Sequence, residues 1–433
     1  MIDVITKSYF VKKEDEGKYL KVPFVVSKDV AKVEINYNYQ KNIITATKKQ
    51  VFKKNQSIID FSINAPKSQY LGSSGSNRSD LYFSLNESSV GFMNPKIMEG
   101  EWVIFLGAYK VPDEGIEVTY TFKFEKKERK LLKGDTHTHS TGSDGSLDLP
   151  LLVATAKNIG LDFLMITDHN NYHTDTGSFS TNDFTLIPGV EWTQYKGHAN
   201  FWNMEEAISD TFVTTNDNET KSYIDKAKSE GAILSLNHPF CHDCPWLWSF
   251  DLAFDVVEVW NGGTYPDSNA KAIDWWHNEL CQGRHIPISA GSDFHAFEPL
   301  RMPGYPTTQV LAHGNNSNDI LEAILQGHAF LTLSPNGPCL DLSKSSALLG
   351  DSYSKNQDLT ISFNHLKHKQ IVKLITNNSC IEYPVEPNQI QQTIEFNTEE
   401  KQFVRFEIWG PLGHDSLIPD DQLLLLTNPI YIQ

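Results

Sequence analysis

Histidine and carboxylate residues gather in the middle of this chain, in short pairs that are typical of metal ligands. The two pairs are His137-x-His139 and Asp293-x-His295. Because alternate residues of an extended segment point the same way, both members of each pair can reach one centre. None of the 15 histidines precedes His137, and 12 of them lie between His137 and His328. This distribution indicates that the middle segment uses imidazole groups for a specific purpose.

Five further His, Asp and Glu residues follow apolar runs in the same segment, which gives a set of nine candidate ligands. The nine are His137, His139, Asp144, His169, Glu191, His198, His238, Asp293 and His295. Six imidazoles and three carboxylates suit Zn, Mn, Fe or Co. Nine donors are too many for one tetrahedral ion. They fit two or three divalent ions, about 3.5–4 Å apart, that share a carboxylate.

The elements that must position these residues are short strands alternating with helices over residues 134–335. Apolar runs predict strands at 163–167, 184–187, 232–236, 256–260 and 286–290. Helical patterns cover 149–159, 219–230, 268–280 and 318–326, and Gly160, Gly231 and Gly327 end three of them. This alternation predicts a parallel sheet, closed or open, with its chemistry at the carboxyl ends of the strands. Glu191 directly follows the apolar run 186–190.

The flanking segments predict β domains, so we expect three domains: 1–130, 134–335 and 336–433. Residues 116–125 alternate strictly between apolar and polar side chains, which is typical of a half-buried strand. Several such runs without a helical pattern predict an N-terminal β-sandwich. Apolar runs after residue 336 predict a C-terminal β domain.

Composition and charge exclude several function classes. Hydrophobic residues make up 39% of the 433 residues and charged residues 21%, which is ordinary for a globular protein. No run approaches the roughly 20 apolar residues of a membrane span. Residues 134–433 carry 15 Lys and Arg against 38 Asp and Glu, so nucleic acid is an unlikely partner. Five cysteines and no apolar leader favour a reducing, cytoplasmic location. The oligomeric state stays open.

The order of the motifs resembles that of a known family. The motifs are His137-Thr-His139, Asp144-Gly, Thr-Asp-His169, Gly-Val-Glu191, His198, His238-Pro and Ser-Asp293-Phe-His295. Together they resemble the PHP (polymerase and histidinol phosphatase) superfamily of metallohydrolases over residues 134–335. The resemblance implies a distorted (β/α)7 barrel with two or three metals at its carboxyl-end face. At position 144 this chain has Asp where some relatives have His, as phosphoesterase-like relatives often do.

The same resemblance implies a ligand set for each metal. The first set is His137, His139, Glu191 and Asp293; the second is Glu191 as bridge, His198 and His238; the third is Asp144, His169 and His295. The flanking β segments, Asn-His-Pro-Phe-Cys at 237–241 and Thr-Asn-Pro-Ile-Tyr at 427–431 are similar to the CehA/McbA-like branch. That branch includes hydrolases of phosphoesters and of carbamate-type esters.

Four other residues are candidates for direct roles in the reaction. Arg301 is one of only eight Lys and Arg residues between 134 and 335. It is suited to bind a phosphate through paired N–H donors. The alternative is that Arg301 forms an ion pair at the surface. Asp168 is expected to orient His169 or a metal-bound water, unless it caps a helix. Asn261 is a candidate substrate contact, although Asn-Gly-Gly is also ordinary turn sequence. His173 is a candidate proton donor to the leaving group.

Cys241-His-Asp-Cys244 has the spacing of half a structural zinc site, but the sequence contains no second Cys pair. We expect this segment to form a loop over the pocket.

The sequence therefore predicts a phosphoesterase in which a metal-bridging hydroxide attacks a small phosphomonoester or phosphodiester. No nucleophilic Ser or Cys motif competes with this interpretation. Three alternatives remain: hydrolysis of carbamate or carboxylic esters at the same metals, a non-catalytic module stabilised by metal, and a carbohydrate-binding assembly whose barrel acts on a sugar phosphate. Exposed aromatic residues on the sandwich would support the third alternative.

Overall fold

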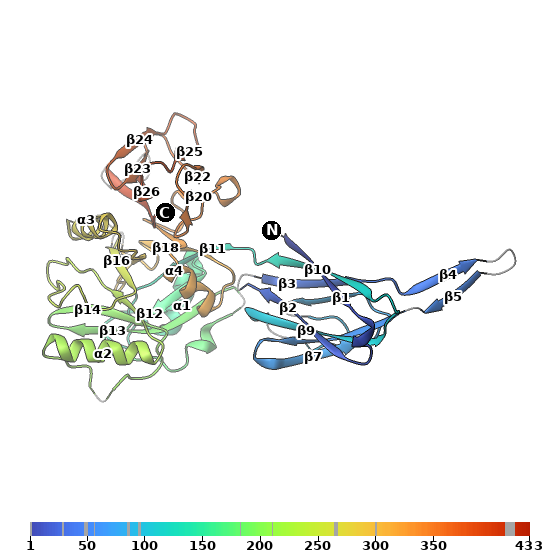
Figure 1. Ribbon diagram of the computed structural model, residues 1–433. Coiled ribbons are helices and arrows are strands. Elements are labelled where there is room, and N and C mark those ends of the chain that lie inside the picture. Colours follow the sequence, from blue (N-terminus) through green and yellow to red (C-terminus); the bar gives the residue numbers. More distant parts are fainter. Residues whose placement is uncertain are drawn as a thin grey trace. The chain divides into compact units, whose positions relative to one another are not determined.

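The computed structural model describes residues 2–27, 30–46, 51–55, 57–84, 87–93, 97–181, 183–209, 211–263, 267–298, 301–411 and 421–433. Over these residues the chain is a mixed α/β protein with many strands and few helices (Figure 1). It divides into two compact units, Met1–Glu128 and Arg129–Gln433. None of the described helices is both long enough and apolar enough to cross a membrane.

The first unit consists of antiparallel strands. They are β1 (Ile2–Val11), β2 (Tyr19–Val26), β3 (Val30–Asn38), β4 (Asn42–Ala46), β5 (Val51–Asn55), β6 (Ile58–Ala65), β7 (Gln69–Ser74), β8 (Asp80–Ser84), β9 (Gly100–Lys110) and β10 (Ile116–Lys126). One sheet has the order β1-β10-β3-β8, a second has the order β2-β9-β6-β7, and β4 pairs with β5. In β10, Val118, Tyr120 and Phe122 are buried, as the alternation predicts. Phe24 stacks on Phe122 with ring centroids 4.4 Å apart, so the two sheets share one core.

The second unit begins with nine strands that form a continuous path. They are β11 (Lys130–Asp135), β12 (Phe163–Ile166), β13 (Thr185–Gln194), β14 (Gly197–Trp202), β15 (Ile233–Leu236), β16 (Val256–Asn261), β17 (Ile288–Gly291), β18 (Thr307–Ala312) and β19 (Ala329–Thr332). Their order is β17-β16-β15-β14-β13-β12-β11-β18-β19. β11, β12 and β13 are parallel to one another, and so are β15, β16 and β17.

The sheet is mixed, which corrects the prediction of an all-parallel sheet. β14 is antiparallel to both β13 and β15, and β18 is antiparallel to β11. The reason lies in the connection, because β13 and β14 are joined by only Tyr195 and Lys196, and so short a link joins antiparallel strands. A regular (β/α)7 barrel is not evident in this strand-rich arrangement. Contacts do join β11 to β17 beyond their carboxyl ends, where Thr138 forms a parallel bridge with Phe294.

Four α-helices occur in the described residues, each within a few residues of its predicted range. They are α1 (Leu149–Ile159), α2 (Asp217–Ser229), α3 (Asp267–Cys281) and α4 (Ser317–Leu325). The bounds of α1 follow from its sequence: the Asp148 side chain accepts a hydrogen bond from the Leu151 N–H, and Gly160 ends the helix with φ of 91°. Short 3₁₀ turns occur at Lys13–Asp15, Pro66–Ser68, Thr176–Phe179 and Leu342–Lys344.

The C-terminal segment is built from strands. They are β20 (Cys339–Leu340), β21 (Ser352–Tyr353), β22 (Asp358–Asn364), β23 (Ile371–Thr376), β24 (Cys380–Pro384), β25 (Gln391–Asn397), β26 (Phe403–Gly410), β27 (Gln422–Thr427) and β28 (Ile430–Ile432). Of these, β20, β22 and β25 form a separate sheet and the others belong to the central sheet. β27 pairs with β19, and the path runs on through β26, β23 and β24, drawn in orange and red in Figure 1. The division into three domains at residues 130 and 335 stays a prediction.

Candidate metal centre

All nine predicted ligands lie in the second unit, on the strands and on the loops that follow them. Four segments follow β11, β12, β15 and β17, as expected: they carry the His137/His139/Asp144 group, His169, His238 and the Asp293/His295 pair. Glu191 and His198 differ, because they lie inside β13 and β14 rather than after a strand. β13 extends to Gln194 since it forms a hairpin with β14, and the hairpin brings its polar residues into the centre.

Glu191 lies at the middle of the cluster and is completely buried. Its Oε1 is 3.2 Å from His137 Nε2, 3.2 Å from His198 Nδ1 and 3.3 Å from His238 Nε2. Its Oε2 is 2.8 Å from His169 Nδ1 and 3.6 Å from His139 Nε2. One carboxylate therefore contacts imidazoles from five separate positions in the sequence, which is the arrangement expected of a bridging ligand.

Asp293, on the loop after β17, contacts two imidazoles of the cluster. Its Oδ1 is 3.1 Å from His139 Nε2 and 3.3 Å from His137 Nε2. The backbone of Asp293 has φ of 51°, a conformation that costs about 1–3 kcal/mol for residues other than glycine and that often occurs at functional sites. The Asp293 N–H donates to the His137 carbonyl, which fixes the two ligand segments to each other.

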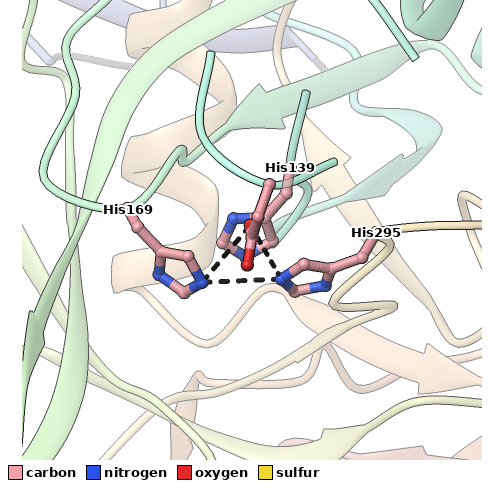
Figure 2. Close-up of side chains that lie close together, drawn as sticks. His139, His169 and His295 are labelled. Carbon is pink, nitrogen blue, oxygen red and sulfur yellow. Dashed lines mark hydrogen bonds and ion pairs between the residues drawn. The ribbon is translucent and has the colours of Figure 1, made fainter. Parts of the chain in front are cut away.

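Four predicted ligands form a second group at the outer edge of the centre. Figure 2 shows the imidazoles of His139, His169 and His295 directed toward a common point. The Nε2 atoms of His169 and His295 are 3.5 Å apart, and Asp144 Oδ1 is 3.6 Å and 3.3 Å from them. The Asp144 side chain is 60% exposed, so this group lies where solvent reaches the centre.

The cluster has the polar surroundings of a cation site. Nε2 of His137 and of His139 are buried and form no hydrogen bond, although both face carboxylate oxygens. Buried polar atoms without a hydrogen-bond partner are rare in proteins and call for an explanation such as an ion. Imidazole nitrogens and carboxylate oxygens are donors that Zn²⁺, Mn²⁺ and Fe²⁺ accept. The residues present therefore fit divalent metal ions.

The electrostatics of the centre also favour added positive charge. Burial by itself lowers the pKa of His137, but the carboxylates of Glu258, Asp293 and Glu191 outweigh burial and raise that pKa well above its ordinary value. Burial raises the pKa of Glu191 and of Asp293, yet neighbouring imidazoles, His137 foremost, hold both pKa values well below their usual range. His238 behaves like His137: burial lowers its pKa, and contacts with Cys241 and Glu191 raise it to about 10.

Sequence reasoning missed two buried carboxylates that support the ligands. Glu258 Oε1 is 3.0 Å from His137 Nδ1, and its Oε2 accepts from the His238 N–H at 3.1 Å. Asp135 accepts backbone N–H groups from His137 and Ser292, and burial raises the pKa of Asp135 to about 6. A single charged residue inside an otherwise apolar strand, as Glu258 is in β16, was the available signal, because such a charge must have a partner.

The four residues predicted to act directly lie around this centre in different ways. Asp168 accepts from Ser140, Ser143 and the Nε2 of His173, 2.5 Å away. His169 is oriented by Thr193, whose Oγ1 is 2.6 Å from Nδ1, and by Glu191. Asp168 therefore holds the loop after β11 and His173.

Asn261 contacts the supporting carboxylate of Glu258, and Arg301 lies near the following residue, Gly262. Asn261 donates through Nδ2 to Glu258 Oε2 at 3.0 Å. The Arg301 side chain is 42% exposed, and its Nε is 3.8 Å from Glu298. Its Nη2 would be 3.8 Å from a Cβ added to Gly262, the residue after Asn261.

The Cys241–Cys244 segment is part of this region. Cys244 belongs to a group with His198 and His238 in which one ligand atom from each residue lies within 4.8 Å of the others. All the cysteines are free thiols.

Comparisons with known proteins give distant structural similarities, among them two crystal structures. No family model and no curated protein matches the chain. One similar crystal structure, from Bacteroides vulgatus, is a two-domain protein containing a predicted PHP-like metal-dependent phosphoesterase. Its sequence is 18% identical to this chain and its TM-score is 0.40. The match covers 70% of this chain and 96% of that chain. A candidate metal-dependent phosphoesterase from Bifidobacterium adolescentis is 15% identical, with a TM-score of 0.31, and the match covers 44% and 94%. Neither similarity establishes the family or the activity of this chain.

Proposed function

We propose that this chain is a metal-dependent hydrolase that acts on a small phosphomonoester or phosphodiester. The observation that supports this most directly is the contact of both Glu191 oxygens with imidazoles from five positions, beside buried ring nitrogens that have no hydrogen bond. A site that served only to stabilise the fold would need four donors. The nine found here exceed that requirement.

The proposed ligand sets are those that the motifs imply. His137, His139, Glu191 and Asp293 would hold one ion. Glu191, His198 and His238 would hold a second, and Asp144, His169 and His295 a third. Groups of donor atoms in the structure overlap these sets in part, since His137 and His139 lie with Glu191, and His169 and His295 lie with Asp144. When bound, ions of this class lower the pKa of water to roughly 7 and neutralise charge on phosphoryl or carbonyl oxygens.

The residues around the ions have assigned roles in this proposal. His173 holds a proton at Nε2 against Asp168 Oδ2 and serves as proton donor to the leaving oxygen. Arg301 binds non-bridging phosphate oxygens, which its 42% exposure makes accessible to a ligand. Asn261 positions Glu258. Hydrolysis of a carbamate or carboxylic ester would use the same centre but would gain less from Arg301.

We extend the proposal to family and fold on the basis of the ordered motifs. It assigns the chain to the PHP superfamily and its CehA/McbA-like branch, with a distorted (β/α)7 barrel over residues 134–335. The bridge between Thr138 and Phe294 supports closure of the seven strands β11 to β17, as does the hydrogen bond that Thr136 Oγ1 donates to the Ala290 carbonyl. A cytoplasmic location is proposed with it.

Elemental analysis followed by a substrate panel tests the function. The purified full-length chain, reloaded in turn with Zn²⁺, Mn²⁺ and Fe²⁺, is assayed on chromogenic phosphomonoesters, phosphodiesters and carboxylic esters. We expect phosphoester hydrolysis that is lost in Asp293→Asn together with bound metal. Activity confined to carboxylic esters would overturn the substrate class. Full activity of a metal-free protein would overturn the mechanism.

A second candidate function, saccharide binding by the first unit, is favoured by one observation. Tyr19 and Tyr70 are 72% and 50% exposed and, with Phe105 and Asp60, line a hollow of about 480 Å³ on the outer face of β2, β9, β6 and β7. Aromatic rings can pack on the apolar faces of sugar rings while a carboxylate accepts hydroxyl hydrogens.

Affinity electrophoresis in gels containing soluble polysaccharides tests this second function. Retardation should be lost in Tyr19→Ala and kept in Tyr109→Ala, since Tyr109 is 71% exposed but lies outside the hollow. Equal mobility of all three proteins in every polysaccharide would refute it.

A further inference from the structure

Cys244 lies at the metal centre because the segment after β15 is fixed at several points. The Cys241 N–H donates to the His238 carbonyl, and the Trp246 N–H donates to the Pro239 carbonyl, so the segment turns back on itself. The Leu247 N–H donates to the Lys196 carbonyl in the hairpin between β13 and β14. These bonds place Cys244 against the strand that carries His198.

The packing of Trp246 reinforces this placement. Trp246 is buried, and a Cβ added to Gly197 would lie 2.7 Å from its ring. The residue before His198 must therefore be small for the segment to approach. Because the backbone hydrogen bonds and the packing against Gly197 both require this close approach, the fold holds Cys244 beside His198.

The sulfur atom lies among ligand atoms of one proposed ion. Cys244 Sγ is 3.7 Å from His238 Nδ1, and the ligand atoms of Cys244, His198 and His238 lie within 4.8 Å of one another. Glu191 Oε1 is 3.2 Å from His198 Nδ1 and 3.3 Å from His238 Nε2. Cys244, His198 and His238 form one group of donor atoms, and Glu191 contacts the other ring nitrogen of His238. With Glu191 included, the proposed set would have four donors, the number that a tetrahedral Zn²⁺ site takes.

We propose that Cys244 is a ligand, as thiolate, to the ion held by Glu191, His198 and His238. The proposal rests on the proposed metal centre and deepens it. A sulfur donor favours Zn²⁺, Co²⁺ or Fe²⁺ over Mn²⁺ and Mg²⁺ at this position. Four protein donors also leave no open position on that ion. The set of His137, His139, Glu191 and Asp293 also has four donors, so the open position for water and substrate would belong to the three-donor set of Asp144, His169 and His295.

Cys241 provides a matched control for Cys244. The two sulfur atoms are 3.0 Å apart, and both residues are partly exposed on the same segment. Among the described residues, however, Cys241 belongs to none of the groups of ligand atoms that could hold an ion. Because Cys241 also contacts His238, its exchange for Ser controls for the loss of a thiol beside that ring, whereas only the exchange of Cys244 removes the proposed donor.

The test is the absorption spectrum of the full-length chain loaded with Co²⁺ under reducing conditions. A thiolate ligand gives a sulfur-to-cobalt charge-transfer band in the near ultraviolet, whereas imidazole and carboxylate ligands give only weak visible bands. We expect the band in the wild type and in Cys241→Ser. We expect Cys244→Ser to lose it, to keep visible cobalt bands, and to bind Zn²⁺ at one site at least about tenfold more weakly.

The outcomes separate this proposal from the function on which it rests. Visible cobalt bands without a charge-transfer band in the wild type, or a charge-transfer band that persists in Cys244→Ser, would refute Cys244 as a ligand and leave the metal centre intact. Failure of the wild type to retain Co²⁺ or Zn²⁺ would refute both.

A second measurement on the wild type avoids any folding defect of the variants. Alkylation of the native chain by iodoacetamide is followed at each thiol by mass spectrometry, with Zn²⁺ or with a chelator. Zn²⁺ should slow alkylation of Cys244 more than that of Cys241. Protection of Cys241 alone, or of neither thiol, would contradict the proposal.

Discussion

Glu258→Gln is expected to weaken metal binding while the chain stays folded. Glu258 is buried, and its carboxylate contacts three donors: His137 Nδ1 at 3.0 Å, the His238 N–H at 3.1 Å and Asn261 Nδ2 at 3.0 Å. Glutamine has the same shape but carries an NH₂ group in place of one oxygen. Because all three neighbours donate, the amide must turn its NH₂ toward at least one donor, and that hydrogen bond is lost.

The magnitude follows from the kind of hydrogen bond that is lost. A hydrogen bond to a charged group contributes about 1.5–3 kcal/mol. At 1.36 kcal/mol for each factor of ten, this is a change of roughly 10- to 150-fold. The change should appear in metal affinity, because the proposed ligand His137 would bind metal as a neutral ring whose Nδ1–H needs an acceptor. Loss of outer contacts to metal-ligating histidines typically weakens affinity by about 10- to 100-fold, in agreement with this value.

The Zn²⁺ affinity is measured by letting the full-length chain compete with a chromophoric chelator for Zn²⁺. Circular dichroism checks that the variant is folded. Glu279→Gln is the matched control, since Glu279 is also a buried glutamate but pairs with Arg284 at 2.6 Å. Zn²⁺ affinity of Glu258→Gln within twofold of the wild type would refute the reasoning, as would an equal loss in the control.

Three further predictions concern other parts of the centre. Gly291→Ala should cost about 1–3 kcal/mol of unfolding free energy and weaken metal binding, because the new Cβ would lie 2.3 Å from His137 Cβ and 2.6 Å from Glu258 Oε1. Urea unfolding measures the loss of stability. Gly177→Ala is the control and should be neutral, because a Cβ there would have no atom within 4 Å. Arg301→Ala should raise KM for phosphoesters with little change in kcat, whereas the control Arg284→Ala should change neither constant. Steady-state kinetics measure both constants. An unchanged KM in Arg301→Ala would refute phosphate binding by Arg301. Chelation should lower the melting temperature, since metal at 100 times its Kd stabilises the folded state by about 2.7 kcal/mol; identical melting curves with and without chelator would contradict this.

The site was largely predictable from sequence because its ligands are few in type and occur in short pairs. His137/His139 and Asp293/His295 needed only the alternation of an extended chain. The structure places His137 and His139 against the Glu191 carboxylate, and Asp293 contacts both of these imidazoles. The place of Glu191 inside β13 was missed because the apolar run ends at residue 190 while the strand continues through polar residues. Strand length there depends on pairing with β14, which a local pattern does not reveal.

The parts that sequence reasoning missed depend on contacts between distant segments. Glu258 is 121 residues from the imidazole that it supports, and Cys244 reaches His198 through a turn held by backbone hydrogen bonds. The prediction of an all-parallel sheet failed for a similar reason, because strand direction is set by the length of each connection and by pairing partners. Helix bounds were predicted more closely, since caps such as Asp148 and Gly160 are local.

The central claim is that Glu191 bridges ions held by side chains that are far apart in the sequence. The most direct test of this claim compares the metal content per chain of the wild type and of Glu191→Gln. Plasma mass spectrometry measures the metal content after dialysis against metal-free buffer. We predict at least two ions per wild-type chain and the loss of both in a folded Glu191→Gln variant, because each of the two sets that share Glu191 loses this donor. A folded wild-type chain that retains fewer than two ions, or a variant that retains the full number, would contradict it.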